Sequence, residues 1–231
     1  MKKIFTFLLL LLSLGAFSQE ILLEQNVKSD TIRPTRGPNL KNYYHVYLGL
    51  GFPVYTNEAV NYTKPGTSLT FDFGVRYKRR ITNFLAVGLD LGMNATAFKV
   101  KQDQGKTVPD TIINDSEKFR ISTTMSSAFV RINVGRRGNY IGNYLDLGAF
   151  GCWNMVKKHI TANKDSQGEK VKVETSRLKY VENFSYGVLA RIGTNRYALT
   201  ARYRMSDIFK ASYALPELPR LTVGFELGLF K

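Results

Sequence analysis

The stretch Leu85–Ala97 alternates without a break between apolar residues and small or polar residues. Successive side chains of a strand point to opposite faces, so this pattern predicts a β-strand with one wholly apolar face. The stretch is longer than the roughly 5 to 6 residues of an ordinary strand and matches the roughly 9 to 11 that cross a bilayer. A long strand of a soluble sandwich would show the same pattern, so the fold depends on whether the pattern is repeated.

The pattern is repeated along most of the chain. In addition to 85–97, we predict amphipathic strands at about 43–52, 69–77, 119–134, 145–155, 180–192, 197–205 and 221–229. One of them changes parity, because the alternating apolar positions of Phe119–Phe129 are followed by Val130, Ile132 and Val134. We therefore expect a β-bulge near Ala128 that restores the facing.

The connections between these predicted strands alternate strictly between long and short, beginning with a long one. A transmembrane barrel has short periplasmic turns and long extracellular loops, whereas a Greek-key sandwich does not require this alternation. We therefore predict an all-β fold, an eight-stranded antiparallel up-and-down transmembrane β-barrel with both termini in the periplasm. Aromatic residues near the ends of the apolar faces fit interfacial girdles: Tyr44, Phe52, Tyr77, Trp153, Tyr180, Tyr197 and Tyr203.

The N-terminus has the pattern of a secretory signal. Lys2 and Lys3 precede an apolar run, and Ala16-Phe17-Ser18 is a small-x-small cleavage site. We predict a signal peptide at 1–18, a periplasmic leader at 19–41 and the barrel at 42–231. An uncleaved anchor is the alternative, but the apolar run is short for one. Cys152 is the single cysteine and cannot form an internal disulfide.

The formal net charge of +15 is high for an exported protein. It favours contact with the phosphates of outer-membrane lipid and lipopolysaccharide, or with an acidic envelope protein, over binding of nucleic acid. No basic helix or set of stacking aromatics in the sequence indicates nucleic-acid binding.

The chain resembles a known class of proteins over about Lys41–Lys231. The signal peptide, strand count, loop alternation and terminal stretch Val223–Phe230 are similar to small outer-membrane barrels of the OmpA/OmpX type and to the PorT-like barrels of Bacteroidota. The resemblance implies insertion by the barrel-assembly machinery. Its recognition signal would lie in the last strand, in Gly224, Phe225, Leu227, Leu229 and Phe230, although Lys231 follows the final aromatic. Such barrels serve as anchors, adhesins, enzymes or secretion accessories, so the resemblance does not fix an activity.

Charged residues alternate with glycines on the predicted inward face. They are Asp72, Arg76, Asp90, Arg120, Asp146, Arg191, Arg202, Arg204 and Glu226. Eight strands enclose an interior that side chains can fill, and unpaired charges in a narrow lumen are costly. We therefore predict a plug of paired carboxylates and guanidiniums, with a narrow channel as the alternative.

Enzymatic chemistry has few candidate residues in this chain. His45 and His159 are the neutral-pH bases, and neither lies in a nucleophile motif. The sequence shows no metal-ligand spacing, and the glycine-rich pieces are typical of turns, so no metal or cofactor is expected. We predict a non-catalytic protein; the alternative is a barrel enzyme that modifies lipid A or cleaves peptides.

The long connections are the remaining candidate surface. The third is rich in lysine and suits a solvated loop beside lipopolysaccharide phosphates. The fourth carries apolar residues that would be unusual in water and predict a partner-docking loop: Ile208, Phe209, Tyr213, Leu215 and Leu218. The sequence thus favours an accessory or structural subunit that presents loops and leader to other envelope proteins, as in a secretion or assembly complex.

Overall fold

The computed structural model describes residues 37–54, 62–64, 66–135 and 138–230. The predicted signal peptide and most of the predicted leader lie outside these residues. The strands are β1 (Asn42–Val54), β2 (Leu69–Arg80), β3 (Leu85–Lys99), β4 (Ser116–Val134), β5 (Asn143–Lys164), β6 (Lys170–Ser176), β7 (Phe184–Thr194), β8 (Tyr197–Arg204) and β9 (Leu221–Leu229), with a 3₁₀ turn η2 at Ala211–Tyr213. No helical segment within the described ranges is long and apolar enough to cross a membrane.

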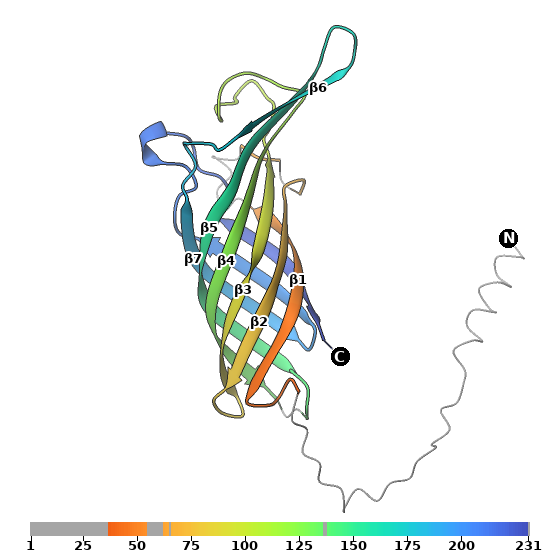
Figure 1. Cartoon of the computed structure of the whole chain (residues 1–231), viewed down its shortest axis with the longest axis vertical. Coiled ribbons are helices and arrows are strands. Elements are labelled where there is room, and N and C mark those ends of the chain that lie inside the picture. The colour runs from red at the N-terminus through yellow and green to blue at the C-terminus, as the bar shows by residue number, and fades with distance from the viewer. Residues whose placement is uncertain (1–36, 55–61, 65, 136–137, 231) are drawn as a thin grey trace, which may run out of the picture. The chain divides into compact units, whose positions relative to one another are not determined.

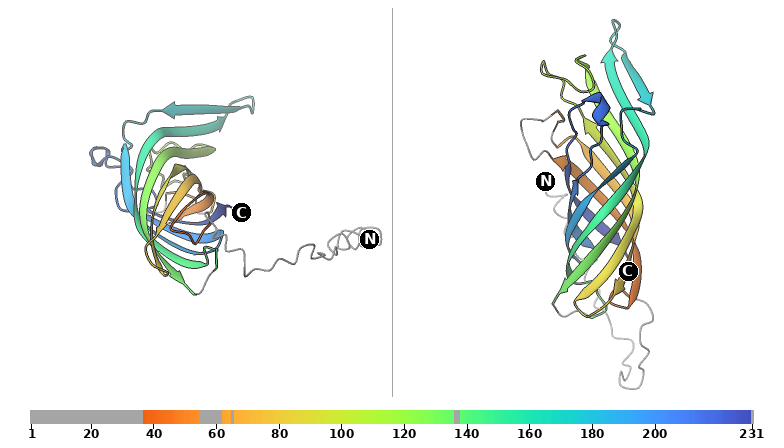
Figure 2. Two further views of the ribbon diagram at one scale, coloured as in Figure 1. Left: turned by 60° about the horizontal axis from the view of Figure 1, so that its bottom comes forward. Right: turned by 90° about the vertical axis from the view of Figure 1, so that its left-hand side faces the viewer.

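Eight of the strands form one antiparallel sheet that closes on itself (Figures 1 and 2). Each strand of the ring pairs with its neighbours in the chain, except that β6 lies outside the ring and β5 pairs directly with β7. β9 returns to β1, with register from Val46↔Leu229 to Val54↔Leu221. The predicted eight-stranded antiparallel ring is confirmed. Closure leaves no unpaired strand edge in the ring.

Most polar and charged residues of the ring point inward and most apolar residues point outward, the reverse of a water-soluble core. On β3, Leu89, Leu91 and Met93 are 57, 63 and 57% exposed, whereas the intervening Asp90 is 1% exposed. The same alternation runs along β1, β2, β7 and β8. The outer surface of the ring is therefore a belt of exposed apolar side chains, far larger than the patches of ordinary soluble monomers.

The predicted bulge near Ala128 is wrong, because β4 is regular at this position. Its alternation is unbroken from Glu117 to Asn133, and the odd-numbered residues point inward throughout. Phe119 and Ile121 are inward-facing core residues, so their apolar character does not mark the outer face. The one irregularity in the β4–β5 pairing lies between Ser122 and Thr123, where β5 carries an extra residue.

β5 extends well beyond its predicted end, and β6 lies in what we expected to be a loop. β6 pairs with the far half of β5, from Lys158↔Ser176 to Lys164↔Lys170. The ends of β4 and β5 and the whole of β6 form a three-stranded sheet that projects beyond the ring, which we call the platform (Figure 1). The outer edge of β6 has no strand partner among the described residues.

The two ends of the ring differ, as the alternation of connections predicts. Short connections at 81–84, 135–142 and 195–196 define the turn end. Long connections at 55–68, 100–115 and 205–220, together with the platform, define the loop end (Figure 2). The expected order of long and short connections is thus present in the structure.

A hydrophobic cluster fills the loop end, and we call it the cap. Its buried members are Phe98, Val100, Val108, Phe119, Ile121, Leu178, Val181, Ile208, Phe209 and Leu218. They come from barrel strands, from the 100–115 and 205–220 connections, and from the link between β6 and β7. These segments therefore fold over the barrel.

Candidate functional site

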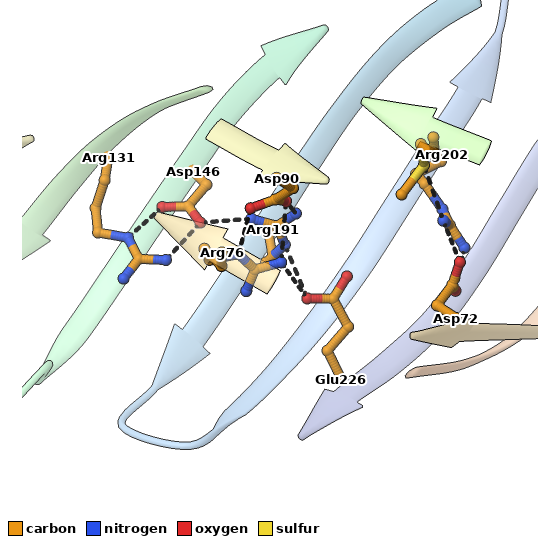
Figure 3. Close-up of polar contacts among 9 residues, drawn as sticks. Asp72, Arg76, Asp90, Arg131, Asp146, Arg191, Arg202 and Glu226 are labelled. Atoms are coloured by element: carbon orange, nitrogen blue, oxygen red, sulfur yellow. Dashed lines mark hydrogen bonds and ion pairs between the residues drawn. The ribbon is translucent and has the colours of Figure 1, made fainter. Parts of the chain in front are cut away.

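A network of ion pairs crosses the inside of the barrel (Figure 3). It joins three guanidiniums to three carboxylates: Arg76, Arg131, Arg191, Asp90, Asp146 and Glu226. These side chains come from β2, β3, β4, β5, β7 and β9 and are 0–6% exposed. Six strands around the ring are thus linked through its centre.

Arg191 is the centre of this network. Its Nη1 lies 2.8 Å from Asp146 Oδ2, its Nη2 lies 2.8 Å from Asp90 Oδ2, and its Nε lies 3.1 Å from Glu226 Oε2. Arg76 binds Asp90 through two hydrogen bonds and donates a third to Glu226 at 2.7 Å. The numbers of positive and negative charges match, so the network is neutral and its charges are paired.

Two of the guanidiniums lie over aromatic rings. The Arg131 guanidinium lies 3.7 Å from the ring centre of Tyr144, and that of Arg76 lies 4.5 Å from Tyr47. Arg131 is a network member that the sequence prediction missed. The outward parity of Val130 and Ile132 is the signal that could have identified it.

A second pair lies nearer the loop end. Arg202 donates two hydrogen bonds to Asp72, at 2.7 and 2.5 Å, and Asp72 accepts a third from Asn94 at 2.6 Å. Arg204 instead binds Glu217 at 2.7 Å, beside the cap. A cavity of about 80 Å³ lies between this pair and the cap, with room for a few water-sized molecules.

Eight of the nine predicted lumen residues are buried inside the barrel, and Arg120 is not. The predicted position of Arg120 is wrong: its side chain is exposed on the outward face of β4. The unbroken parity of β4 causes this, because Phe119 and Ile121 take the inward positions on either side.

The apolar residues of the predicted partner-docking loop are mostly buried, so the expectation that they are exposed to water is wrong. Ile208, Phe209 and Leu218 are 6, 3 and 2% exposed and belong to the cap, and Leu215 packs against it. Tyr213 alone remains an exposed aromatic, at 50%. The buried apolar residues of this connection contribute to the cap at the loop end.

The two histidines lie at opposite ends of the barrel. His45 is buried near the turn end between Tyr43 and Phe230, with ring centres 5.4 and 5.2 Å away. Phe230 therefore packs at the inside of the turn end, whereas Phe225 and Leu229 of the same predicted assembly signal are exposed on the belt. Gly224 packs against the backbone of Leu50.

His159 lies in a polar cluster at the base of the platform. Its Nε2 is 2.7 Å from Glu117 Oε1, and its ring stacks on Phe119. Glu117 Oε2 binds Lys106 Nζ at 2.6 Å and accepts hydrogen bonds from Gln102 and Asn114. Burial raises the pKa of Glu117, but the hydrogen bonds from His159 and Lys106 outweigh it and lower that pKa to about 2. No serine or cysteine of the described chain hydrogen-bonds His159.

This cluster fixes the 100–115 connection to the barrel. Lys106 is buried and also binds Asp110, and Gln102 Oε1 accepts from the backbone N–H of Asn114 at 2.7 Å. Within the described residues, no group of three or more His, Cys, Asp or Glu side chains could hold a metal ion. The arrangement is that of a structural anchor for the connection.

The outward face of the platform is strongly basic. Lys118 and Arg120 on β4 lie beside Lys158 on β5, and Lys172 on β6 lies beyond. Burial and then the neighbouring cations Arg120, Lys172, Lys99 and Lys170 lower the pKa of Lys118. Glu174 is the acidic residue on this face and is paired with Lys158 at 2.6 Å.

Comparison with known proteins returns no matching family model and no matching curated protein.

Proposed function

We propose that this chain spans the outer membrane as a barrel closed to ions, and that it serves as a structural or accessory subunit of an envelope complex. The observation that carries the proposal is the inverted surface of the ring. A continuous belt of apolar side chains faces outward, while every carboxylate and guanidinium of the central network is paired inside.

The closed interior favours a structural role over conduction. A permeating ion would have to separate buried pairs around Arg191, and the cap covers the loop end above them. We expect no conductance steps when the full-length protein is inserted into a planar bilayer, in either KCl or a salt of larger ions. Regular single-channel steps would instead support the narrow-channel alternative.

The platform is the surface that an accessory role would use. The outer edge of β6 has no strand partner in the described chain, and its Val171 and Val173 are 49 and 57% exposed. A free strand edge can add a strand from another chain, with backbone hydrogen bonds supplying affinity. This fits a subunit that a larger envelope complex recruits at the cell surface.

The accessory role is testable in the native membrane. The full-length protein would be extracted in mild detergent from its own outer membrane, and the mass of the particle measured by native mass spectrometry. We expect defined protein partners, which the variant Val171→Ser/Val173→Ser loses. The matched control is Ile112→Ser/Ile113→Ser, two exposed apolar residues of another connection, and should keep them. A particle that contains this protein alone would contradict the proposal.

A further inference from the structure

A groove opens in the barrel wall at the base of the platform. β5 pairs with β7 as far as Trp153↔Phe184 and with β6 from Lys158↔Ser176 onward, so residues 154–157 have a partner strand on the β4 side only. The groove in this gap has a volume of about 660 Å³. Its lining residues are Met155, Val156, Lys157, Lys158, Ser176, Arg177, Leu178, Lys179, Asn183, Lys210 and Tyr213.

The lining is strongly cationic. Five of these residues are lysine or arginine, and none is aspartate or glutamate. Lys157 donates to the Val181 carbonyl at 3.1 Å and to Asn183 Oδ1 at 2.6 Å, which fixes it at the groove wall. Burial and the nearby Lys210 lower the pKa of Lys157, as expected where cations are crowded.

Besides Lys157, whose hydrogen bonds go to neutral oxygens, three of the cations have no acidic partner within the described residues. Arg177 and Lys179 come from the link between β6 and β7, and Lys210 comes from the 205–220 connection. Their side chains form no ion pair there, whereas Lys158 is paired with Glu174. Two segments far apart in the sequence, the β6–β7 link and the 205–220 connection, thus bring uncompensated positive charge to one place.

The groove also has an apolar side that continues the belt. Met155 is 59% exposed and follows Trp153, which is 60% exposed at the end of the β5–β7 pairing. Tyr213, the exposed aromatic of the 205–220 connection, also lines the groove. An occupant would therefore meet both cations and an apolar surface that continues into the belt.

We propose that this groove binds the phosphorylated headgroup of a membrane lipid, with the lipid's acyl region against Met155 and the belt. This inference rests on the proposed membrane location. The combination of uncompensated cations and adjoining apolar surface distinguishes a phosphorylated lipid from a free anion, which would need only the cations. The lysine-rich connection is then a specific lipid site and not only a solvated loop.

The test measures binding of bisphosphorylated lipid A to the full-length protein in neutral detergent, by native mass spectrometry. The variant Arg177→Gln/Lys179→Gln/Lys210→Gln should weaken binding on the order of a hundredfold, because each cation beside an anionic lipid contributes about a factor of five. The control Lys41→Gln/Lys64→Gln/Arg79→Gln removes the same charge from exposed positions elsewhere and should bind as the unmodified protein does. Equal weakening in both variants, or none in the first, would overturn the proposal.

Two further arms identify the ligand. Dephosphorylated lipid A should not bind measurably, and its equal binding would exclude phosphate recognition. Millimolar inorganic phosphate should not displace the lipid, and effective displacement would show a simple anion site. Quenching of Trp153 by brominated lipid, measured on the same preparation, separates the two proposals. Quenching without lipid A binding refutes the groove alone, whereas absence of quenching refutes the membrane location itself.

Discussion

Among single residues, the charges buried inside the barrel matter most to the fold. Arg191 binds Asp90, Asp146 and Glu226 at once, and each of the four side chains is 0–6% exposed. Buried ion pairs contribute little net stability, but removal of one partner leaves charge without compensation. The network therefore adds little net stability when intact, but the loss of one of its members lowers the free energy of unfolding.

Arg191→Met should lower the free energy of unfolding by about 3–5 kcal/mol, because three carboxylates would share the two remaining guanidiniums. Urea unfolding in detergent micelles, followed by the gel mobility of the folded barrel, measures this loss. Arg79→Met, at an exposed position of β2, should change little. Equal stability of the two variants would show that the network is not a structural element.

Glu117 gives the loop end a specific dependence on pH. Its folded-state pKa of about 2 lies below the ordinary value of 4.5, so the fold favours the carboxylate. The resulting stabilisation is complete above about pH 4.5 and is lost as the pH falls toward 2. Lys106 and His159, which bind this carboxylate, would then lose their anionic partner.

We expect amide exchange in residues 100–115, corrected for intrinsic rates, to accelerate between pH 4.5 and pH 2. Glu117→Gln should show fast exchange already at pH 6, whereas Glu169→Gln, at an exposed position, should behave as the unmodified protein does. Exchange in Glu117→Gln that matches the unmodified protein at pH 6 would contradict the anchoring role.

At the scale of the elements, glycines allow large rings to lie inside a narrow barrel. A Cβ on Gly88 would lie 2.2 Å from Phe129 Cζ and 2.6 Å from the backbone oxygen of Tyr77. A Cβ on Gly193 would likewise lie 2.3 Å from Tyr144 Cζ. Each ring thus occupies the space that a side chain on the neighbouring strand would need.

Gly88→Ala should therefore destabilise the barrel by about 1–3 kcal/mol through overpacking against Phe129 and the strand backbone. Thermal unfolding in detergent measures the effect. Gly105→Ala, where the nearest atom to a new Cβ is the Asp103 carboxylate at 3.8 Å, should be nearly neutral. An unchanged midpoint for Gly88→Ala would mean that the ring can move aside freely.

The alternation of residues was sufficient to predict the eight strands of the ring, because a barrel with a polar inside and an apolar outside shows period two in every strand. The same rule failed where apolar residues occur on both faces. On β4, Phe119 and Ile121 face the cap, so the apolar positions misidentified the outer side and placed Arg120 in the lumen.

The loops were less predictable than the strands, because their apolar residues have more than one possible cover. From the sequence, Ile208 and Phe209 could pack against a partner protein or against other residues of this chain. The sequence does not reveal that they share a buried cluster with Phe119. β6 was missed because its alternation is short: only Val171 and Val173 are apolar, and the polar residues Glu174, Thr175 and Ser176 follow. The burial of Ile208 and Phe209 and the pairing of β6 with β5 both depend on contacts between segments distant in the sequence.

At the scale of the whole molecule, the account depends on what surrounds the belt. Its exposed apolar side chains occur on all eight strands of the ring, and two aromatics, Trp153 and Phe184, lie where the ring meets the platform. In water this surface would aggregate, whereas in lipid it is the expected one. The central claim is that lipid contacts this belt.

The sole tryptophan of the chain provides the most direct measurement of that claim. Trp153 is 60% exposed on the belt, so its fluorescence reports the surroundings of the outer surface. The full-length protein would be refolded into phosphatidylcholine vesicles that carry bromine at defined acyl positions. The account predicts blue-shifted emission and strong quenching. The quenching should be strongest when the bromines lie near the headgroup end of the acyl chains. Emission typical of water, without quenching by any brominated lipid, in a protein with full β-structure would contradict it.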